Sequence, residues 1–180
     1  MTEWITSGTW HLDDTAQGRL RSAMELMLGD KVLDIGCRDG TFVLTAARDN
    51  PNKQFIGTDI DNANIDMANA KAEELGIKNA TFFYDDITDS KLPMKGEFDT
   101  VYCMETMEHL LPDTLERAHN NSTAFCKKGG RFVISVPAST HISDPDHKSV
   151  FYREIMMRDN PDLKWSDTCP HLWLMFYLDV

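Results

Sequence analysis

Short apolar runs alternate along this chain with longer stretches of helical periodicity. The short runs are rich in β-branched and aromatic residues, whereas the longer stretches place apolar residues every three or four positions. Alternation of this kind predicts a parallel sheet whose strands are joined by crossover helices. The five segments that we predict to be parallel strands are KVLDI (31–35), QFIGT (54–58), TFFY (81–84), DTVYC (99–103) and RFVISV (131–136).

The helices expected around these strands have recognisable ends. A first helix over 13–28 ends at Gly29, Asp61 can cap the helix after the second strand, and Pro112 opens the helix before the fifth. Two strand candidates remain near the end of the chain, and we expect them to pair and complete the sheet. The other expected helices cover 41–49 and about 150–160, and the late strand candidates are LKWSD (163–167) and HLWLMFYLD (171–179).

The length and the charge of the chain limit its class. It has 180 residues and a net charge of −11. This length suits one globular domain, so we expect a single domain over 1–180, with an N-terminal helical cap over 1–29 and a core over 30–180. The negative charge opposes binding to nucleic acid or to an anionic membrane, because both carry the same sign.

For the oligomeric state we expect a monomer or a homodimer.

The cysteines and the N-terminus predict a cytoplasmic protein. The four cysteines lie far apart and form no C-x-x-C pair, which is typical of a reduced chain. No run approaches the roughly 18 consecutive apolar residues that a membrane-spanning helix needs. The N-terminal residues lack the basic and apolar regions of a signal peptide.

The segment VLDIGCRDG (32–40) is a predicted strand that runs into two glycines and then a helix. Glycines at such a place let the backbone approach a ligand, and the start of the helix offers free N–H groups to an anion. The dinucleotide fingerprint G-x-G-x-x-G would need glycine at positions occupied by Arg38 and Thr41, so nicotinamide binding matches poorly. The phosphate-binding sequence G-x-x-x-x-G-K-[ST] is absent.

An aspartate two residues before the glycine loop belongs to a different pattern. With Asp34 in that place, VLDIGCRDG resembles the first motif of the class I S-adenosylmethionine-dependent methyltransferases, except that Arg38 replaces the middle glycine. Four further segments match the motifs of that family in order and spacing, over about residues 30–178. They are FIGTDID (55–61), FFYDDITD (82–89), FDTVYCMETMEHL (98–110) and GGRFVISVP (129–137).

This resemblance implies a fold and a cofactor. The fold is an α/β, Rossmann-like doubly wound sheet, mostly parallel with an antiparallel last strand, in the order 3-2-1-4-5-7-6 with helices on both faces. The cofactor is S-adenosylmethionine and the product S-adenosylhomocysteine. Asp59 would hold the ribose hydroxyls, because a carboxylate can accept two hydrogen bonds from a diol. The implied cofactor residues are Asp34, Gly36, Cys37, Gly40, Asp59, Ile60, Asp86, Ile87 and Cys103.

Two positions near the expected cofactor raise questions of side-chain direction. Arg38 must turn outward or reach for the carboxylate of the cofactor, and we expect cofactor binding to be retained. Asp85 and Asp86 are adjacent, so we expect only one of them to point into the site.

Methyl transfer from a sulfonium is an in-line displacement, in which the protein holds the reacting atoms in line within a dry cavity. A general base is optional, and the catalytic candidates are His109, Glu105 and His147. With Glu108 these residues resemble the metal-binding set of the small-RNA 3′-end 2′-O-methyltransferases. Similar strings also occur in small-molecule O-methyltransferases that use no metal, and the net charge opposes RNA. We therefore predict no metal and no nucleic acid.

The acceptor is expected to be a small molecule with an oxygen or nitrogen to be methylated. Two alternatives stay open: a metal-assisted RNA ribose 2′-O-methyltransferase, and a catalytically silent module that binds S-adenosylmethionine. The N/D-P-P-Y/F sequence of many amino-methyltransferases is absent, which disfavours amines of bases or of glutamine. The acceptor cavity is expected to draw on Trp4, Trp10, His11, the loop 138–149, Phe151 and Tyr152.

Overall fold

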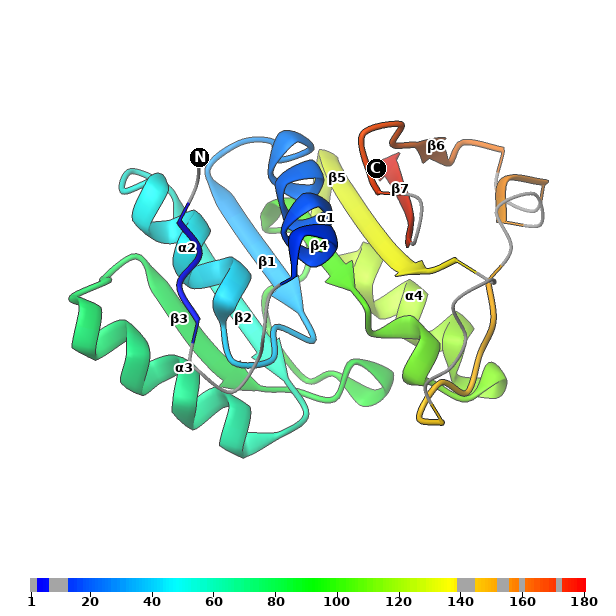
Figure 1. Ribbon diagram of the computed structural model, residues 1–180. Helices are drawn as coiled ribbons and strands as arrows, with labels where there is room; N and C mark the ends of the chain where they lie inside the picture. Colours follow the sequence, from blue (N-terminus) through cyan, green and yellow to red (C-terminus); the bar gives the residue numbers. More distant parts are fainter. Residues whose placement is uncertain (1–2, 7–12, 139–144, 152–155, 159–160, 171–172) are drawn as a thin grey trace.

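The structure is a computed structural model that describes residues 3–6, 13–138, 145–151, 156–158, 161–170 and 173–180 (Figure 1). Within these ranges seven strands form one sheet in the order β3-β2-β1-β4-β5-β7-β6. The strands are β1 (Lys31–Ile35), β2 (Gln54–Asp59), β3 (Ala80–Tyr84), β4 (Phe98–Met104), β5 (Cys126–Pro137), β6 (Lys164–Trp165) and β7 (Trp173–Asp179).

The directions of the strands confirm the expected fold class. Neighbours from β3 to β5 are parallel, whereas β7 runs antiparallel to both β5 and β6. The two late strand candidates therefore pair and complete the sheet as predicted. The result is a Rossmann-like α/β sheet, in which ligands bind beyond the carboxyl ends of the strands.

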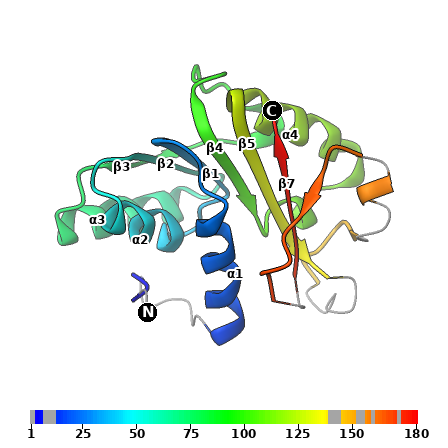
Figure 2. The ribbon, with the colours of Figure 1, turned by 90° about the horizontal axis from the view of Figure 1, so that it is seen from above.

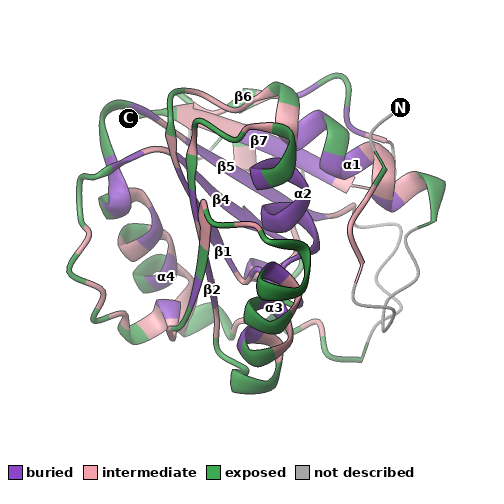
Figure 3. Ribbon diagram, turned by 90° about the vertical axis from the view of Figure 1, so that its left-hand side faces the viewer, coloured by how far each residue is buried: buried purple, intermediate pink, exposed green. Residues whose placement is uncertain are grey.

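Helices cover both faces of the sheet, as Figure 2 shows. Helices α1, α2 and α3 lie on one face, and α4 lies on the other. Two hydrophobic clusters fill the two interfaces, and Figure 3 shows the central strands buried between the layers. The helices are α1 (Asp14–Glu25), α2 (Thr41–Asp49), α3 (Asn62–Leu75) and α4 (Pro112–Phe125), with short 3₁₀ turns at η1 (Ile87–Asp89) and η2 (Met107–His109).

Local signals set the ends of these helices. Asp61 caps α3 by accepting a hydrogen bond from the backbone N–H of Ala63, as predicted. Gly76 ends that helix in the left-handed conformation, and Pro112 stands at the start of α4. Asp13 caps α1 through a hydrogen bond from the backbone N–H of Ala16.

Two predicted boundaries need correction. Helix α1 ends at Glu25 and not at Leu28, because the side chain of Thr100 bonds both backbone groups of Leu28 and holds that residue against β4. Strand β5 begins at Cys126 and not at Arg131, and its pairing with β4 shifts register between these two residues. Periodicity alone does not reveal such an irregularity.

The segment expected to form a helix over 150–160 is described only at 150–151 and 156–158, and residues 156–158 are helical. Within the described residues, the structure contains no helix with the length and apolar character needed to cross a membrane.

Candidate active site

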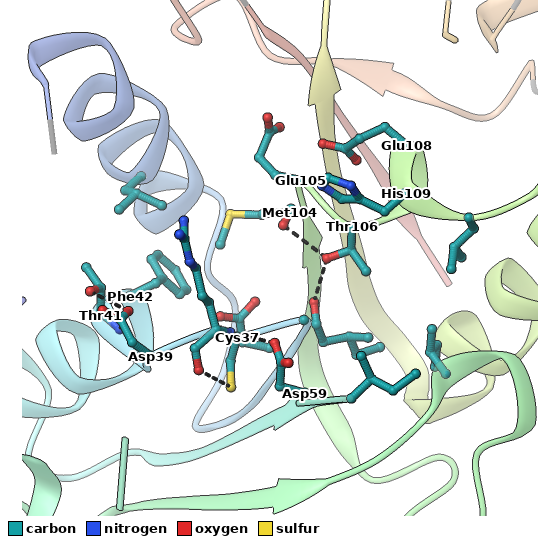
Figure 4. Close-up of a pocket in the computed structure, with 18 of the residues that line it drawn as sticks. Cys37, Asp39, Thr41, Phe42, Asp59, Met104, Glu105, Thr106, Glu108 and His109 are labelled. Carbon is teal, nitrogen blue, oxygen red and sulfur yellow. Dashed lines mark hydrogen bonds between the residues drawn. The ribbon is translucent and has the colours of Figure 1, made fainter. Parts of the chain in front are cut away.

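A cavity of about 560 Å³ opens at the carboxyl ends of four adjacent strands, β3, β2, β1 and β4. Residues from every one of these ends line it, together with residues of α1 and α2. Figure 4 shows two groups on opposite sides, with Cys37 and Asp59 in one and Glu105, Glu108 and His109 in the other. The cavity lies at the edge where a Rossmann-like sheet binds its ligands.

The glycine loop after β1 forms the floor of this cavity. Gly36 has a φ of +73°, and a Cβ atom there would overlap the hydroxyl oxygen of Thr106. That hydroxyl donates to the carbonyls of Ile35 (3.3 Å) and Met104 (3.2 Å), so the ends of β1 and β4 are tied together. Glycine is required at position 36 because the side chain of Thr106 packs against the backbone there and leaves no space for a Cβ atom. Gly40, also left-handed, is the N-cap residue of α2 and is not among the residues that line the cavity.

Arg38 stands where the family motif has its middle glycine. Its φ of +52° lies in the left-handed region that favours glycine, so the family's middle glycine suits the backbone conformation at this position. Arg38 is exposed and also lines the cavity, and the expectation that its side chain turns outward or toward the carboxylate of the cofactor stays a prediction. Its backbone N–H donates to Asp59 at 2.9 Å, so the arginine is built into the loop.

Asp59, at the end of β2, organises the neighbouring loop. One carboxylate oxygen accepts from the backbone of Asp61 (2.9 Å) and from the amide of Asn64 (3.2 Å). The other accepts from the backbone of Arg38. A carboxylate has about four acceptor positions, so one position remains on the second oxygen. The resemblance implied that Asp59 would hold the hydroxyls of a ribose diol, and this expectation stays a prediction.

The next loop along the sheet follows β3. Asp86 caps η1 by accepting from the backbone and the hydroxyl of Thr88, at 2.9 and 2.7 Å. Both Asp85 and Asp86 line the cavity, and the expectation that only one of the two side chains points into it stays a prediction. Burial raises the pKa of Asp85, and hydrogen bonds from Ser90 and Lys91 oppose this effect. Two apolar residues, the exposed Ile60 and the buried Ile87, flank these carboxylates.

A buried charge cluster forms the inner wall. Asp34 is 3% exposed and Arg19, from α1, is 4% exposed. Burial raises the pKa of Asp34 to about 8, while the positive charge of Arg19 lowers it. The Nη1 of Arg19 donates to the hydroxyl of Ser135 at 3.5 Å, and its guanidinium carbon lies 5.4 Å from the ring centroid of Trp173.

The two cysteines of the expected cofactor set differ in position. Cys37 is buried and lines the cavity, and burial raises the pKa of its thiol well above the ordinary range. Cys103 is completely buried in the cluster beneath α4 and is not among the residues that line the cavity. Both thiols are buried, and their interpretation as small filling residues and not nucleophiles stays a prediction.

The catalytic candidates gather on the opposite side of the cavity. Glu105 directly follows β4, and Glu108 and His109 belong to η2. The backbone N–H groups of Lys148 and Ser149 both donate to the carbonyl of Glu108, at 2.7 and 3.0 Å. These bonds attach the segment that carries His147 to η2.

Three of the four residues that resemble a metal-binding set come together. One ligand atom each from Glu108, His109 and His147 lies within 4.8 Å of the others. The two imidazole rings form an edge-on contact with centroids 5.0 Å apart. The Nδ1 atom of His109 lies 3.3 Å from the carbonyl oxygen of Asp146. Glu105 is not part of this group, because its carboxylate is bound elsewhere.

The carboxylate of Glu105 is held by two strands. Trp173 of β7 donates its indole N–H to Oε2 at 2.5 Å, and the hydroxyl of Ser135 in β5 donates to Oε1 at 3.1 Å. Burial raises the pKa of Glu105, and Arg19, Trp173 and Ser135 oppose this effect.

Arg19 and Trp173 are the main site residues that sequence reasoning missed. Arg19 did carry a signal, since it lies on the apolar stripe of α1 between Ala16 and Ala23. A charged residue on a buried stripe predicts a buried partner. Trp173 carried no such signal, because an aromatic residue in an apolar strand is ordinary.

The expected acceptor residues are only partly in place. Trp4 packs against the core near α2 and Phe151 lines a separate cavity beside α4, so neither lines this site. Trp10, His11 and Tyr152 lie outside the described residues.

The sheet order, the glycine loop and the carboxylates after β1, β2 and β3 define the class of this protein. It is a class I S-adenosylmethionine-dependent methyltransferase. A family model described as a methyltransferase domain matches residues 28–172, so the chain belongs to that family.

Relatives and solved structures agree with this membership. The chain is 26% identical to a ubiquinone biosynthesis O-methyltransferase of Acinetobacter baylyi, over 86% of this chain and 75% of the relative. A protein of the same name from Vibrio parahaemolyticus is 32% identical over 61% of this chain, but the match spans only 44% of that relative. The fold resembles an S-adenosylmethionine-dependent methyltransferase from Clostridium acetobutylicum, with a TM-score of 0.74, 14% identity and 91% of each chain covered. It also resembles the methyltransferase domain of a bacterial Hen1, with a TM-score of 0.73, 15% identity, and 93% of this chain and 100% of that chain covered.

Proposed function

We propose that this methyltransferase moves the methyl group of S-adenosylmethionine to an oxygen or nitrogen atom of a small-molecule acceptor by in-line displacement. The observation that carries the proposal is that one cavity joins the glycine loop and Asp59 to the candidate bases His109 and His147. The volume of about 560 Å³ is in the range of small-molecule sites. Oxygen is the preferred acceptor atom, since relatives that share a quarter to a third of their residues are named O-methyltransferases.

The buried charges support binding of the amino-acid end of the cofactor. Arg19 is a buried cation beside the glycine loop and suits a carboxylate, whereas Asp34 suits an ammonium group. A buried charge is stable only with a partner, so each would gain from its opposite in the ligand. Their arrangement therefore favours a zwitterionic amino-acid group at the inner wall.

The nucleoside end would lie along β2 and β3. The remaining acceptor position of Asp59 suits one ribose hydroxyl. Ile60 and Ile87 supply apolar surface for the faces of an adenine ring, and the carboxylate of Asp86 supplies an acceptor for its amino group.

When bound, the cofactor supplies a methyl group made electrophilic by the adjacent sulfonium. The chain orients the acceptor and excludes water, which is the larger part of catalysis in a displacement of this type. A proton on Nδ1 of His109 would be donated to the carbonyl of Asp146, leaving Nε2 free to accept a proton from the acceptor. His147, edge-on to this ring, is the second candidate base.

Calorimetry and product analysis test the proposal. We expect the protein to bind S-adenosylmethionine and to form S-adenosylhomocysteine only when a phenolic or other hydroxyl acceptor is added. His109→Ala should keep cofactor affinity and lower turnover by about 10²-fold or more, as loss of a general base does. Binding without turnover across a broad acceptor panel would favour a silent cofactor-binding module, and failure to bind the cofactor would refute both.

A second candidate is metal-assisted transfer to vicinal hydroxyls. The observation that favours it is the Glu108, His109 and His147 cluster, whose oxygen and nitrogen donors suit a divalent ion. The first proposal needs no metal. Turnover that is unchanged by a chelator and by added Mg²⁺ or Mn²⁺ would exclude the second candidate, whereas strict metal dependence would exclude the metal-free form.

A further inference from the structure

Glu105 is held in an unusual backbone conformation at the centre of the site. Its φ is +52°, in the left-handed region that is strained for a non-glycine residue. Strain of this kind persists only where the surroundings enforce it. The backbone N–H of Glu105 donates to the carbonyl of Ser135 at 2.9 Å, and the hydroxyl of the same serine binds the carboxylate. The end of β5 therefore imposes both the backbone and the side-chain position.

Trp173 completes this arrangement from β7. Its indole N–H donates to Oε2 of Glu105 at 2.5 Å, while its ring faces the guanidinium of Arg19. One tryptophan thus contacts both the half-buried carboxylate of Glu105 and the buried guanidinium of Arg19. Both oxygens of Glu105 are bound on the side of the cavity where Arg19 lies.

The other acidic and imidazole groups lie nearby. His147 is close enough for its charge to act on Glu105, and it belongs to the cluster with Glu108 and His109. Glu105 has a side chain of the right chemistry to join that cluster as a fourth donor. The hydrogen bonds from Trp173 and Ser135 hold its carboxylate in a different place.

We propose that Trp173 is a positioning residue that fixes the Glu105 carboxylate beside Arg19 and apart from the Glu108–His109–His147 cluster. The hydrogen bond thereby keeps the cluster at three donors and leaves Glu105 at the inner wall with Arg19. This inference rests on the proposed function only in regarding the cluster as the acceptor side of the cavity. Trp173 then keeps the Glu105 carboxylate away from that side.

Manganese binding tests this assignment without cofactor or acceptor. Trp173→Phe keeps an aromatic ring over Arg19 and removes only the N–H donor, so Glu105 can turn toward the histidines. We expect Mn²⁺ to bind on the order of tenfold more tightly to this variant than to the wild type, as measured by electron paramagnetic resonance of free Mn²⁺. Trp165→Phe, the same change in β6, is the matched control and should bind Mn²⁺ like the wild type. The gain should disappear in the double variant Trp173→Phe, Glu105→Gln.

Equal Mn²⁺ affinity in Trp173→Phe and the wild type, or a gain that survives the Glu105→Gln change, would overturn the proposal. A second measurement covers the case in which Trp173→Phe does not fold. In ¹⁵N-labelled wild type one indole N–H resonance should be shifted downfield by its bond to a carboxylate, and Glu105→Gln should move it. If no indole resonance moves, Trp173 does not hold Glu105. A failure of the wild type to bind S-adenosylmethionine would refute the proposed function and leave these two measurements unaffected.

Discussion

At the scale of single residues, the glycine loop shows that the environment of a side chain determines its burial and its protonation. Asp34 and Arg38 lie four positions apart in the same motif, yet one is a buried acid and the other an exposed cation. Burial raises the pKa of Asp34, whereas Arg38 is constrained by the left-handed backbone conformation that it adopts. Each leads to a measurable prediction.

Asp34 makes stability depend on pH. Its pKa is about 8 in the folded chain and about 3.9 in the unfolded chain, so the folded state binds the proton more tightly. The stabilisation is fully present below about pH 4 and is lost as the pH rises through about 8, a change of up to roughly 6 kcal/mol in the free energy of unfolding. Asp34→Asn should flatten this decline in urea unfolding between pH 5 and 9. The same slope in variant and wild type would show that other groups cause it.

Arg38→Gly should not impair folding. Glycine relieves the left-handed strain of about 1–2 kcal/mol but adds about 0.5–1 kcal/mol of unfolded-chain entropy. We therefore expect the free energy of unfolding to stay equal or rise by up to about 1.5 kcal/mol, with affinity for S-adenosylmethionine retained. Arg21→Gly, the same change in the exposed face of helix α1, should lose about 1 kcal/mol. A tenfold gain in cofactor affinity in Arg38→Gly would show instead that the arginine obstructs the loop.

At the scale of elements, α1 is a part of the site as well as a cover for the sheet. Its apolar stripe packs on the core, and Arg19 in that stripe carries a charge to the inner wall of the cavity. Strands β5 and β7 act in the same way through Ser135 and Trp173. The site therefore depends on how these elements pack.

Arg19→Met should weaken binding at the amino-acid end of the cofactor site and leave binding at the nucleoside end unchanged. Loss of a charged hydrogen bond costs about 1.5–3 kcal/mol, so the dissociation constant for S-adenosylmethionine should rise by about tenfold or more. Adenosine, which has no carboxylate, should bind the variant and the wild type equally in calorimetry. Arg21→Met, on the exposed face of the same helix, should leave both affinities unchanged. Equal loss for adenosine would indicate general damage to the cavity.

At the scale of the whole molecule, the net charge of −11 favours a small-molecule acceptor over RNA. RNA would have to approach against this repulsion, since the affinity of nucleic-acid proteins comes largely from contacts to phosphates. We expect no shift of single-stranded RNA in gel electrophoresis at about 50 mM salt, with or without Mn²⁺. Binding that weakens linearly with the logarithm of salt concentration would support the RNA alternative.

Periodicity in the sequence determined the fold class and the loops that form the cavity, whereas the sheet order was implied by the resemblance to the methyltransferase family. These features follow from local patterns, because alternating elements with β-rich strands admit few topologies. The sequence also placed Asp59 at the end of the second strand and Asp86 in the loop after the third.

Only the tertiary structure decided how the side chains meet. The end of α1 and the start of β5 depended on contacts with β4, which lie far along the chain. The exclusion of Glu105 from the histidine cluster depended on Trp173, 68 residues away in sequence. The physical reason is that a hydrogen bond is set by distance and direction in space, and neither can be read from spacing along one segment. Sequence patterns therefore located the site, and packing between distant strands determined which of its groups are held together.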